Sequence, residues 1–552
     1  MPLSRRAGRL AAIMLWAVPL AAQTRTSPDI TPQDLRRRLF LIADDSMGGR
    51  RSGSAGDFAT ASYVASEFQR LGLRPAGDSG TWFQTVPFFF LEPAATALAA
   101  GEAALTAGAD YVLVGRPVAT APLANVAAVY GGTATDSSSW IGADQASGKF
   151  VVFDVRAGSD GQRRLAPRLR GLVTSPRFAR AAAVAVAELD LLAPELVSQI
   201  GGRRLISDTA REGGQPPLLL ITPGAAERLL GADPGRLVPG AVGGAVRGDL
   251  GVRFTPVPFP ARNVVAVLPG SDPALRGEYV ALTAHNDHVG YDHSPVDHDS
   301  LRAFNRVVRP MGADSPDRPA TPEEGARVRA ILDSLRRHQA ARRDSIRNGA
   351  DDDGSGTVAI LEIAEALATG PQRPRRSILF VSHTGEEEGL VGSSWFTDHA
   401  TVPTDSIVAE IDEDMVGRGT TADLPEGGPT YLEVVGARRL SREFGDLLEA
   451  ANAAQPQPFR FNYAYDAPGH PLQYYCRADH YSYARYGIPS VALSRGEHLD
   501  YHQVTDEAQY IDYDDLARVA RLVRDAALRI ANLDHRPALD HPRGDPHAVC
   551  VQ

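Results

Sequence analysis

Side chains of the types that bind metal ions follow three apolar segments of the chain, each directly after the segment ends. They are His285 and Asp287 after the run 279–284, Glu386, Glu387 and Glu388 after 377–382, and Asp412 and Asp414 after 406–411. In an open parallel sheet, ligands collect beyond the carboxyl ends of the strands, so three such strands would bring these groups to one rim. An acidic turn at 349–356 and a late segment at 500–506 carry the same residue types. The sequence therefore predicts a metal-binding site at this rim.

Histidine and carboxylate ligands suit zinc, manganese or cobalt, with zinc the default for this ligand set. Only Cys476 and Cys550 are present, and neither belongs to a CxxC motif. Histidines and carboxylates would therefore have to hold the metal, while the sequence leaves open whether the two cysteines pair. Each signal is weak alone, because a lone histidine, an acidic glycine turn or a run of glutamates is usually structural.

Strand and helix patterns alternate around these residues. Four apolar runs, 263–268, 279–284, 377–382 and 406–411, are typical of buried parallel strands. Helical spacing of apolar residues predicts helices over 34–43, 58–71, 357–368 and 515–531. The alternation predicts an α/β fold, with a mixed, mostly parallel sheet flanked by helices.

A charged segment at 291–348 interrupts this alternation. It predicts an inserted surface element with a charged helix over 323–346. We interpret its charge as a solvated face, with a lid over the site as the alternative.

The remaining stretches suggest a division of the chain. Residues 1–22 join three arginines to an apolar stretch and small residues, as in a secretory signal peptide, so export to the periplasm or the medium is expected. An N-terminal membrane anchor or a buried helix is the alternative. Short apolar runs broken by glycine and proline predict a separate β-rich domain. The predicted parts are the signal peptide 1–22, a helical part 23–100, a β-rich insert 101–258, a catalytic domain 259–532 and a tail 533–552.

The overall composition excludes some classes of partner. The 552 residues are 43% hydrophobic and 22% charged, which is typical of a globular protein. A formal net charge of -10 does not favour a nucleic-acid partner. No run of 18 apolar residues follows the N-terminus, so no membrane association is expected once the signal is removed.

In their order along the chain, these motifs resemble the M28 family of metallopeptidases. The family pattern is HxD, GADDxxSG, EExGLxGS, DMxG and a late YHxxxD, and this chain has the corresponding residues at 285–287, 349–356, 386–393, 414–417 and 501–506. The resemblance covers about 262–530, and the β-rich insert resembles the protease-associated domain common in this family. It implies the zinc-exopeptidase fold.

Carried over by motif position, the resemblance implies two zinc ions per chain. Asp352 would bridge them, His285 and Asp414 would complete one site, and Glu387 and His502 would complete the other. A carboxylate has two oxygens and can join two cations, whereas a neutral imidazole offers one lone pair.

The catalytic position of the family falls on Glu386. This carboxylate would act as general base toward a water that bridges the metals. Asp287 would orient the imidazole of His285, since metal-bound histidines usually donate their second N–H to such a group. His288 and His383 have no metal role in the family pattern and are left out of the predicted ligand set.

The implied activity is that of an exopeptidase on peptides or proteins, and an aminopeptidase is the preferred form. A carboxypeptidase would need cations to hold the substrate carboxylate, for which Arg418 and Arg477 are candidates. A site for the substrate amine could involve Glu388, Asp412 or Tyr475. A single-zinc glutaminyl cyclase and an inactive binding or receptor module are the remaining alternatives, although no ligand position is lost. The sequence does not predict the oligomeric state.

Overall fold

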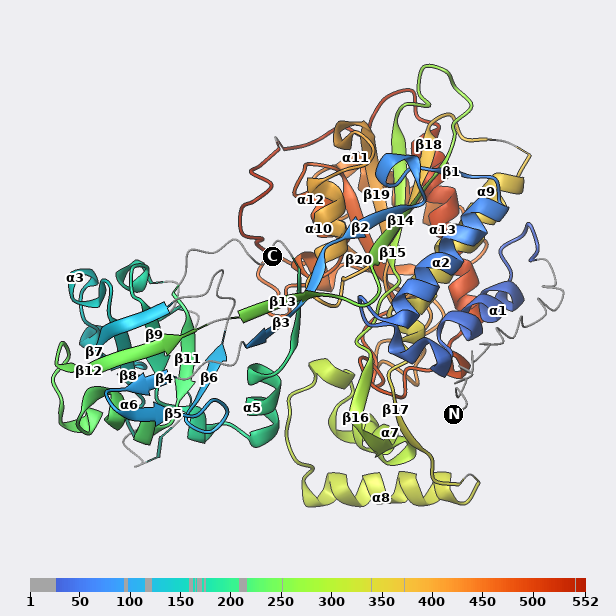
Figure 1. Cartoon of the computed structure of the whole chain (residues 1–552). Helices are drawn as coiled ribbons and strands as arrows, with labels where there is room; N and C mark the ends of the chain where they lie inside the picture. The colour runs from blue at the N-terminus through green and yellow to red at the C-terminus, as the bar shows by residue number, and fades with distance from the viewer. Residues whose placement is uncertain are drawn as a thin grey trace, which may run out of the picture.

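The computed structural model describes residues 26–552 apart from 94–97, 115–121, 158–161, 164, 166–170, 173–174, 208–215, 251, 339, 372 and 542. The expected signal peptide lies outside these residues. A large α/β lobe carries a β-rich lobe on one side and a small helical element that projects from one end (Figure 1). Within the described residues, no helix is both long and apolar enough to cross a membrane.

The large lobe is built on a sheet of nine described strands. They are β1 (Arg74–Pro75), β2 (Phe83–Val86), β14 (Ala261–Leu268), β15 (Tyr279–His285), β18 (Ser377–His383), β19 (Ile407–Glu413), β20 (Tyr431–Val435), β21 (Arg460–Asn462) and β22 (Ser490–Ser494). Their order is β1-β14-β18-β15-β19-β22-β20-β21, and β2 also pairs with β14. The central strands β18, β15, β19 and β22 are parallel to one another.

One strand direction differs from the sequence prediction. The run at 263–268 forms β14 as expected, but β14 pairs antiparallel with β18. The prediction of a parallel strand there is wrong, because burial on both faces makes a strand apolar whichever way it runs. The fold class is nevertheless confirmed as a mixed sheet with a parallel centre.

Helices cover both faces of this sheet. On one face lie α1 (Pro32–Ile42), α2 (Ala55–Arg70), α9 (Gly356–Thr369), α11 (Arg442–Ala453) and α13 (Tyr513–Ala531), and on the other α10 (Val391–Asp398) and α12 (His480–Ala484). The four helices expected from apolar spacing are confirmed as α1, α2, α9 and α13. Side chains cap three of them, since Thr31, Ser54 and Asp512 accept hydrogen bonds from backbone N–H groups in the first turn.

The β-rich lobe has its own sheet and core. Its eight described strands are β4 (Leu98–Ala100), β5 (Ala103–Leu105), β6 (Tyr111–Val114), β7 (Pro122–Thr133), β8 (Phe150–Asp154), β9 (Ala183–Val186), β11 (Leu218–Ile221) and β12 (Val242–Asp249). The helices α3 (Ala143–Ala146), α5 (Pro194–Gly201) and α6 (Pro223–Leu230) accompany them. A three-stranded sheet of β3 (Phe88–Pro93), β10 (Arg204–Ser207) and β13 (Val252–Pro256) lies between the two lobes (Figure 1).

The projecting element comprises β16 (Tyr291–Asp297), α7 (His298–Val308), α8 (Pro322–Arg336) and β17 (Arg343–Ile346). The helix predicted over 323–346 is therefore too long, because its last residues pair with β16 instead. No described residue of α8 is buried, which agrees with a solvated charged face. The element is tied to the large lobe, since His298 Nε2 lies 2.9 Å from Glu507 Oε2 and Asn305 donates to the carbonyl of Leu499.

The C-terminal tail is fastened across the large lobe. Cys476 and Cys550 form a disulfide, which answers the question that the sequence left open. The side chain of Gln552 accepts a hydrogen bond from the backbone of Tyr475 and donates to the carbonyl of Tyr465. The tail thus holds the segment around Cys476 in place.

Candidate metal centre

Four neighbouring strands end at one rim of the large sheet, and the sequence-predicted site residues gather there. His285 ends β15, Glu386 and Glu387 follow β18, Asp414 follows β19, and His502 lies in the loop after β22. The turn before α9 adds Asp352. The order of the parallel strands explains why residues far apart in sequence meet.

One group of possible metal ligands comprises His285, Asp352 and Asp414. The Nε2 atom of His285 lies 3.1 Å from Asp352 Oδ1 and 3.7 Å from Asp414 Oδ1. Glu386 stands beside this group, with its Oε2 atom 4.0 Å from the same nitrogen.

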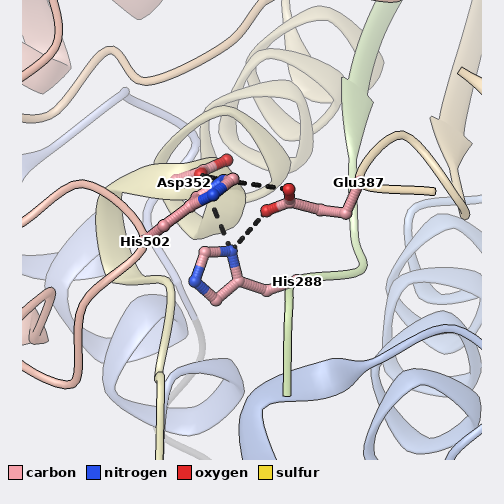
Figure 2. A group of neighbouring side chains, drawn as sticks. All are labelled: His288, Asp352, Glu387 and His502. Atoms are coloured by element: carbon pink, nitrogen blue, oxygen red, sulfur yellow. Dashed lines mark ion pairs between the residues drawn. The ribbon is translucent and has the colours of Figure 1, made fainter. Parts of the chain in front are cut away.

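A second group comprises His288, Asp352, Glu387 and His502, whose side chains point toward one another (Figure 2). His502 Nε2 lies 2.9 Å from both Asp352 Oδ2 and Glu387 Oε2. His288 Nδ1 lies 2.7 Å from Glu387 Oε1 and 3.7 Å from Asp352 Oδ2. Asp352 therefore directs one oxygen to each group, as a bridging carboxylate would.

Both groups fit a zinc ion by spacing and by donor type. Two ligands at about 2.0–2.1 Å from one tetrahedral ion are about 3.3 Å apart, and the distances above scatter around this value. Several of the donor atoms are buried without a hydrogen-bond partner in the described structure: His285 Nε2, His288 Nδ1, Asp352 Oδ2 and Glu387 Oε1. Buried polar atoms are rarely left in this way, and a cation among them would satisfy them.

The charges of the rim perturb one another strongly. Burial lowers the pKa of His285, but the carboxylates of Asp287, Asp352 and Asp414 around its ring outweigh this effect and leave the pKa well above its ordinary value. Burial raises the pKa of Asp352, yet the three histidines His285, His502 and His288 hold the pKa well below the usual range. Carboxylates thus accumulate around a few imidazoles, an arrangement suited to cations.

Glu386 differs from the ligands in its surroundings. Burial raises its pKa well above the ordinary value; the charge of His285 opposes this, while Glu387 and Asp414 add to it. Glu386 belongs to neither ligand group, yet it lines the pocket that opens beside them. It is therefore placed to exchange protons with a group in that pocket.

Asp287 supports the site through three contacts. Its backbone carbonyl lies 3.1 Å from His285 Nδ1, closer than its carboxylate oxygen at 3.7 Å. The carboxylate accepts hydrogen bonds from the backbone N–H of Glu386 at 3.2 Å and from the hydroxyl of Ser52 at 2.9 Å. Asp287 thus fixes both the imidazole of His285 and the backbone of Glu386.

A buried arginine holds the loops that carry the ligands. Arg50, fully buried, donates to the carbonyls of Asn286 at 2.9 Å and Gly349 at 2.8 Å, and also to that of Asn348. Asp506, which the YHxxxD motif contains, accepts from the backbone N–H groups of the 349–356 turn. These contacts fix the position of the bridging aspartate.

His288 is the member of the site that sequence reasoning missed. Its ring is fully buried, and its backbone N–H donates to the carbonyl of Arg50 at 3.2 Å. A Cβ at Gly349 would lie 2.4 Å from His288 Cγ, so glycine leaves the room that this ring needs. No motif or spacing in the sequence marks this ring, because the segments that enclose it, around Arg50 and Gly349, are distant in the chain. His383, the other omitted histidine, instead lies 3.0 Å from the hydroxyl of Tyr483.

The side chains considered for binding substrate termini are mostly engaged elsewhere. Arg418 pairs with Asp423 and Asp500, and Glu388 pairs with Arg51 at 3.1 Å. Asp412 accepts a hydrogen bond from Thr283 at 2.9 Å and Tyr475 is buried. Arg477 alone of these candidates is among the described residues that line the pocket.

The comparisons with known proteins agree with these motifs. Similar curated proteins include Aminopeptidase NAALADL1 of Rattus norvegicus, 52% identical over 60 residues (10% of this chain, 8% of the relative). Leucine aminopeptidase 1 of Paracoccidioides brasiliensis is 30% identical over 184 residues (32% and 44%), and a probable zinc metalloprotease of Pyricularia oryzae is 26% identical over 217 (33% and 42%). The chain thus spans less than half the length of each of these relatives.

Solved structures that match the chain include the aminopeptidase from Aneurinibacillus sp. strain AM-1, with a TM-score of 0.47 and 15% identity over 93% of this chain and 96% of that one. Residues 263–527 match the model of peptidase family M28, and this stretch contains both ligand groups. Over these residues, the chain belongs to peptidase family M28.

Proposed function

We propose that this protein is a zinc-dependent aminopeptidase that holds two zinc ions. One observation carries the proposal: the two oxygens of Asp352 face different ligand groups, and Glu386 stands beside them at the edge of a pocket. The ligands are His285, Asp352 and Asp414 for one ion and Asp352, Glu387 and His502 for the other, with His288 added to the second group.

The identity of the metal rests on the donors and on the relatives. Imidazoles and carboxylates without thiolates suit zinc, and a similar protein is named a probable zinc metalloprotease. Zinc ions held there would polarise the carbonyl of a peptide bond and ease the loss of a proton from water.

In this reaction, Glu386 acts as the general base and acid. Its carboxylate accepts the proton of the attacking water and returns it to the amine that leaves. Asp287 holds the backbone of Glu386, and so keeps the carboxylate at the edge of the pocket. Glu387, the next residue, faces the second ligand group instead.

The charge of the pocket favours an aminopeptidase over a carboxypeptidase. Arg477 is the one arginine or lysine among the described lining residues, and it lies 2.6 Å from Asp314, so its charge is already paired. Acidic side chains otherwise prevail there, and these attract the amino end of a peptide rather than its carboxylate. Two of the similar proteins are named aminopeptidases, which agrees with this choice.

We also propose that the protein is exported and that the β-rich lobe is a protease-associated domain. The signal-like residues 1–22 and the disulfide between Cys476 and Cys550 support export, since disulfides persist in oxidising compartments. The division of the chain at 23, 101, 259 and 533 is part of this proposal.

The activity is tested with the chain lacking residues 1–22, on dipeptides and aminoacyl anilides with free and acetylated amino ends. We expect cleavage of the free-amine substrates alone, with loss of activity on chelation and recovery with zinc. Cleavage of acetylated peptides from the carboxyl end would indicate a carboxypeptidase. Bound zinc without hydrolysis of any peptide would contradict the proposal and favour a cyclase or a binding module.

A further inference from the structure

The pocket beside the ligand groups is lined by five acidic side chains, and two of them have no role in the proposed hydrolysis. Asp352, Glu386 and Asp414 line the end of this pocket at the rim of the sheet. Glu433 and Glu497 line it as well, although neither belongs to a ligand group among the described residues. Their role has to be sought in what the pocket binds.

Glu433 projects from β20 and is 3% exposed. Its Oε1 atom accepts a hydrogen bond from the hydroxyl of Tyr431 at 2.6 Å, and this hydroxyl also accepts one from Asn462 at 2.9 Å. Burial raises the pKa of Glu433 to about 7. Among the described residues, Glu433 thus accepts a hydrogen bond from a neutral hydroxyl, and no arginine or lysine forms an ion pair with it.

Glu497 is 8% exposed and only partly compensated. Its Oε2 atom is buried without a hydrogen-bond partner in the part of the chain that the structure describes. Its Oε1 atom lies 3.5 Å from Arg477 Nη1, but the same nitrogen is closer to Asp314, at 2.6 Å. The single arginine is therefore shared between two carboxylates, and burial raises the pKa of Glu497 to about 8.

The rest of the lining would suit the stem of a long side chain. Met415, Val435 and Ala492 offer apolar surface, and Tyr474 and Tyr501 add aromatic rings. A lysine or arginine side chain has the matching character, because its methylene groups pack on apolar surface while its charged end seeks acceptors or aromatic faces.

From these contacts we infer that the pocket selects peptides whose first residue carries a cationic side chain, lysine or arginine, with Glu433 and Glu497 as the groups that recognise the charge. Glu433 has no cationic partner among the described residues, and Glu497 shares Arg477 with Asp314, so the three carboxylates exceed the one arginine and a bound cation would balance the excess. A cation in the pocket would stabilise the charged forms of Glu433 and Glu497, whereas a neutral side chain would leave both carboxylates to take up protons at their raised pKa. The inference rests on the proposed aminopeptidase function, since it assigns this pocket to the first residue of the substrate.

Matched substrates test the inference. Lysyl and norleucyl anilides share a four-carbon stem and differ in the terminal ammonium group. We expect kcat/KM to be about tenfold to a hundredfold higher for the lysyl substrate, because a hydrogen bond to a charged group typically contributes a factor of this size. Glu497→Gln and Glu433→Gln are expected to remove most of this ratio by lowering the lysyl value, and to leave the norleucyl value within about threefold. Glu323→Gln, on the exposed face of α8, is the control and should leave both values unchanged.

Equal rates for the two wild-type substrates would overturn the inference, and this measurement needs no variant to fold. An equal fall for both substrates in a well-folded variant would also overturn it, because a group that binds the α-amino end or supports the fold acts on both alike.

Binding separates this inference from the proposed function. In thermal unfolding of the zinc-loaded protein, lysinamide should stabilise the wild type more than norleucinamide, and Glu497→Gln should remove the difference. If no anilide is cleaved but this difference is found, the aminopeptidase assignment fails and the cationic pocket stands. If anilides are cleaved and neither the rates nor the unfolding distinguish the two ligands, the aminopeptidase stands and the cationic pocket fails.

Discussion

The Nδ1 atom of His288 lies 2.7 Å from the Oε1 atom of Glu387, while His502 faces the other oxygen, Oε2, at 2.9 Å. Both ring nitrogens of His288 are buried without a hydrogen-bond partner among the described residues. His288 therefore either completes the second ligand group or fixes Glu387 within it.

Removing this histidine should weaken metal binding in either case. We expect His288→Ala to lower zinc affinity by about tenfold to a hundredfold, as for groups that bind a metal or orient its ligands. Competition with a coloured chelator measures the affinity. His383→Ala is the matched control, because His383 is also buried but contacts Tyr483 and Asn263. An affinity that falls equally in both variants would show a general loss of structure instead.

Replacing Glu386 should separate catalysis from metal binding. We expect Glu386→Gln to lower kcat by about a hundredfold to ten-thousandfold, because it removes the group that carries the proton. Zinc content should stay unchanged, since Glu386 lies outside both ligand groups. Glu388→Gln is the control, with a small effect, because Glu388 pairs with the half-exposed Arg51. Loss of zinc from Glu386→Gln would make this residue a ligand rather than a base.

A buried arginine joins three helices of the large lobe. Arg38 of α1 lies 2.6 Å from each of three carboxylates, those of Glu67, Glu362 and Glu365. We expect Arg38→Met to lower the free energy of unfolding by about 3–5 kcal/mol, because buried carboxylates lose their partner. Urea denaturation checks this value. The neighbouring Arg37→Met should change it by less than about 1 kcal/mol, since that side chain is 46% exposed. A similar loss in both variants would contradict this role.

The disulfide should stabilise the folded tail. Cys476 and Cys550 are 74 residues apart, and a loop of this length corresponds to about 4 kcal/mol in the chain-entropy model. We expect the double variant Cys476→Ser, Cys550→Ser to unfold at lower temperature and to lose its tail to proteases sooner. Dithiothreitol should reproduce both effects in the wild type and have none on the double variant. An unchanged wild type after complete reduction would contradict the prediction.

Much of the site at the rim of the sheet could be predicted from sequence, because its residues directly follow strands that the apolar pattern reveals. Strands of the parallel centre are apolar on both faces, and the residues that follow them reach one edge, so His285, Glu386 and Asp414 could be placed together. The same logic failed for β14, whose apolar pattern carries no information about direction. The predicted helix over 323–346 was also too long, because the pairing of its last residues with β16 outweighs their helical propensity.

Contacts between distant segments account for the rest. His288 is held by the backbone of Arg50, and its ring fits against Gly349, which has no side chain to obstruct it. Asp314 contacts the pocket residue Arg477 from the segment 291–348, which the sequence indicates to be a surface insertion. Neither relationship has a periodic or motif signature, so neither could be inferred from residue types and spacing.

The central claim is that two metal ions share the carboxylate of Asp352, and a measurement of metal content tests it most directly. Zinc per chain would be measured after dialysis for the wild type, His285→Ala and Asp352→Asn, each checked for folding by circular dichroism. We predict two zinc ions in the wild type, one in His285→Ala, and fewer than one in Asp352→Asn, because both ions lose a ligand there. One zinc ion in the wild type, or one retained in full by Asp352→Asn, would contradict the claim that this residue joins two metal sites.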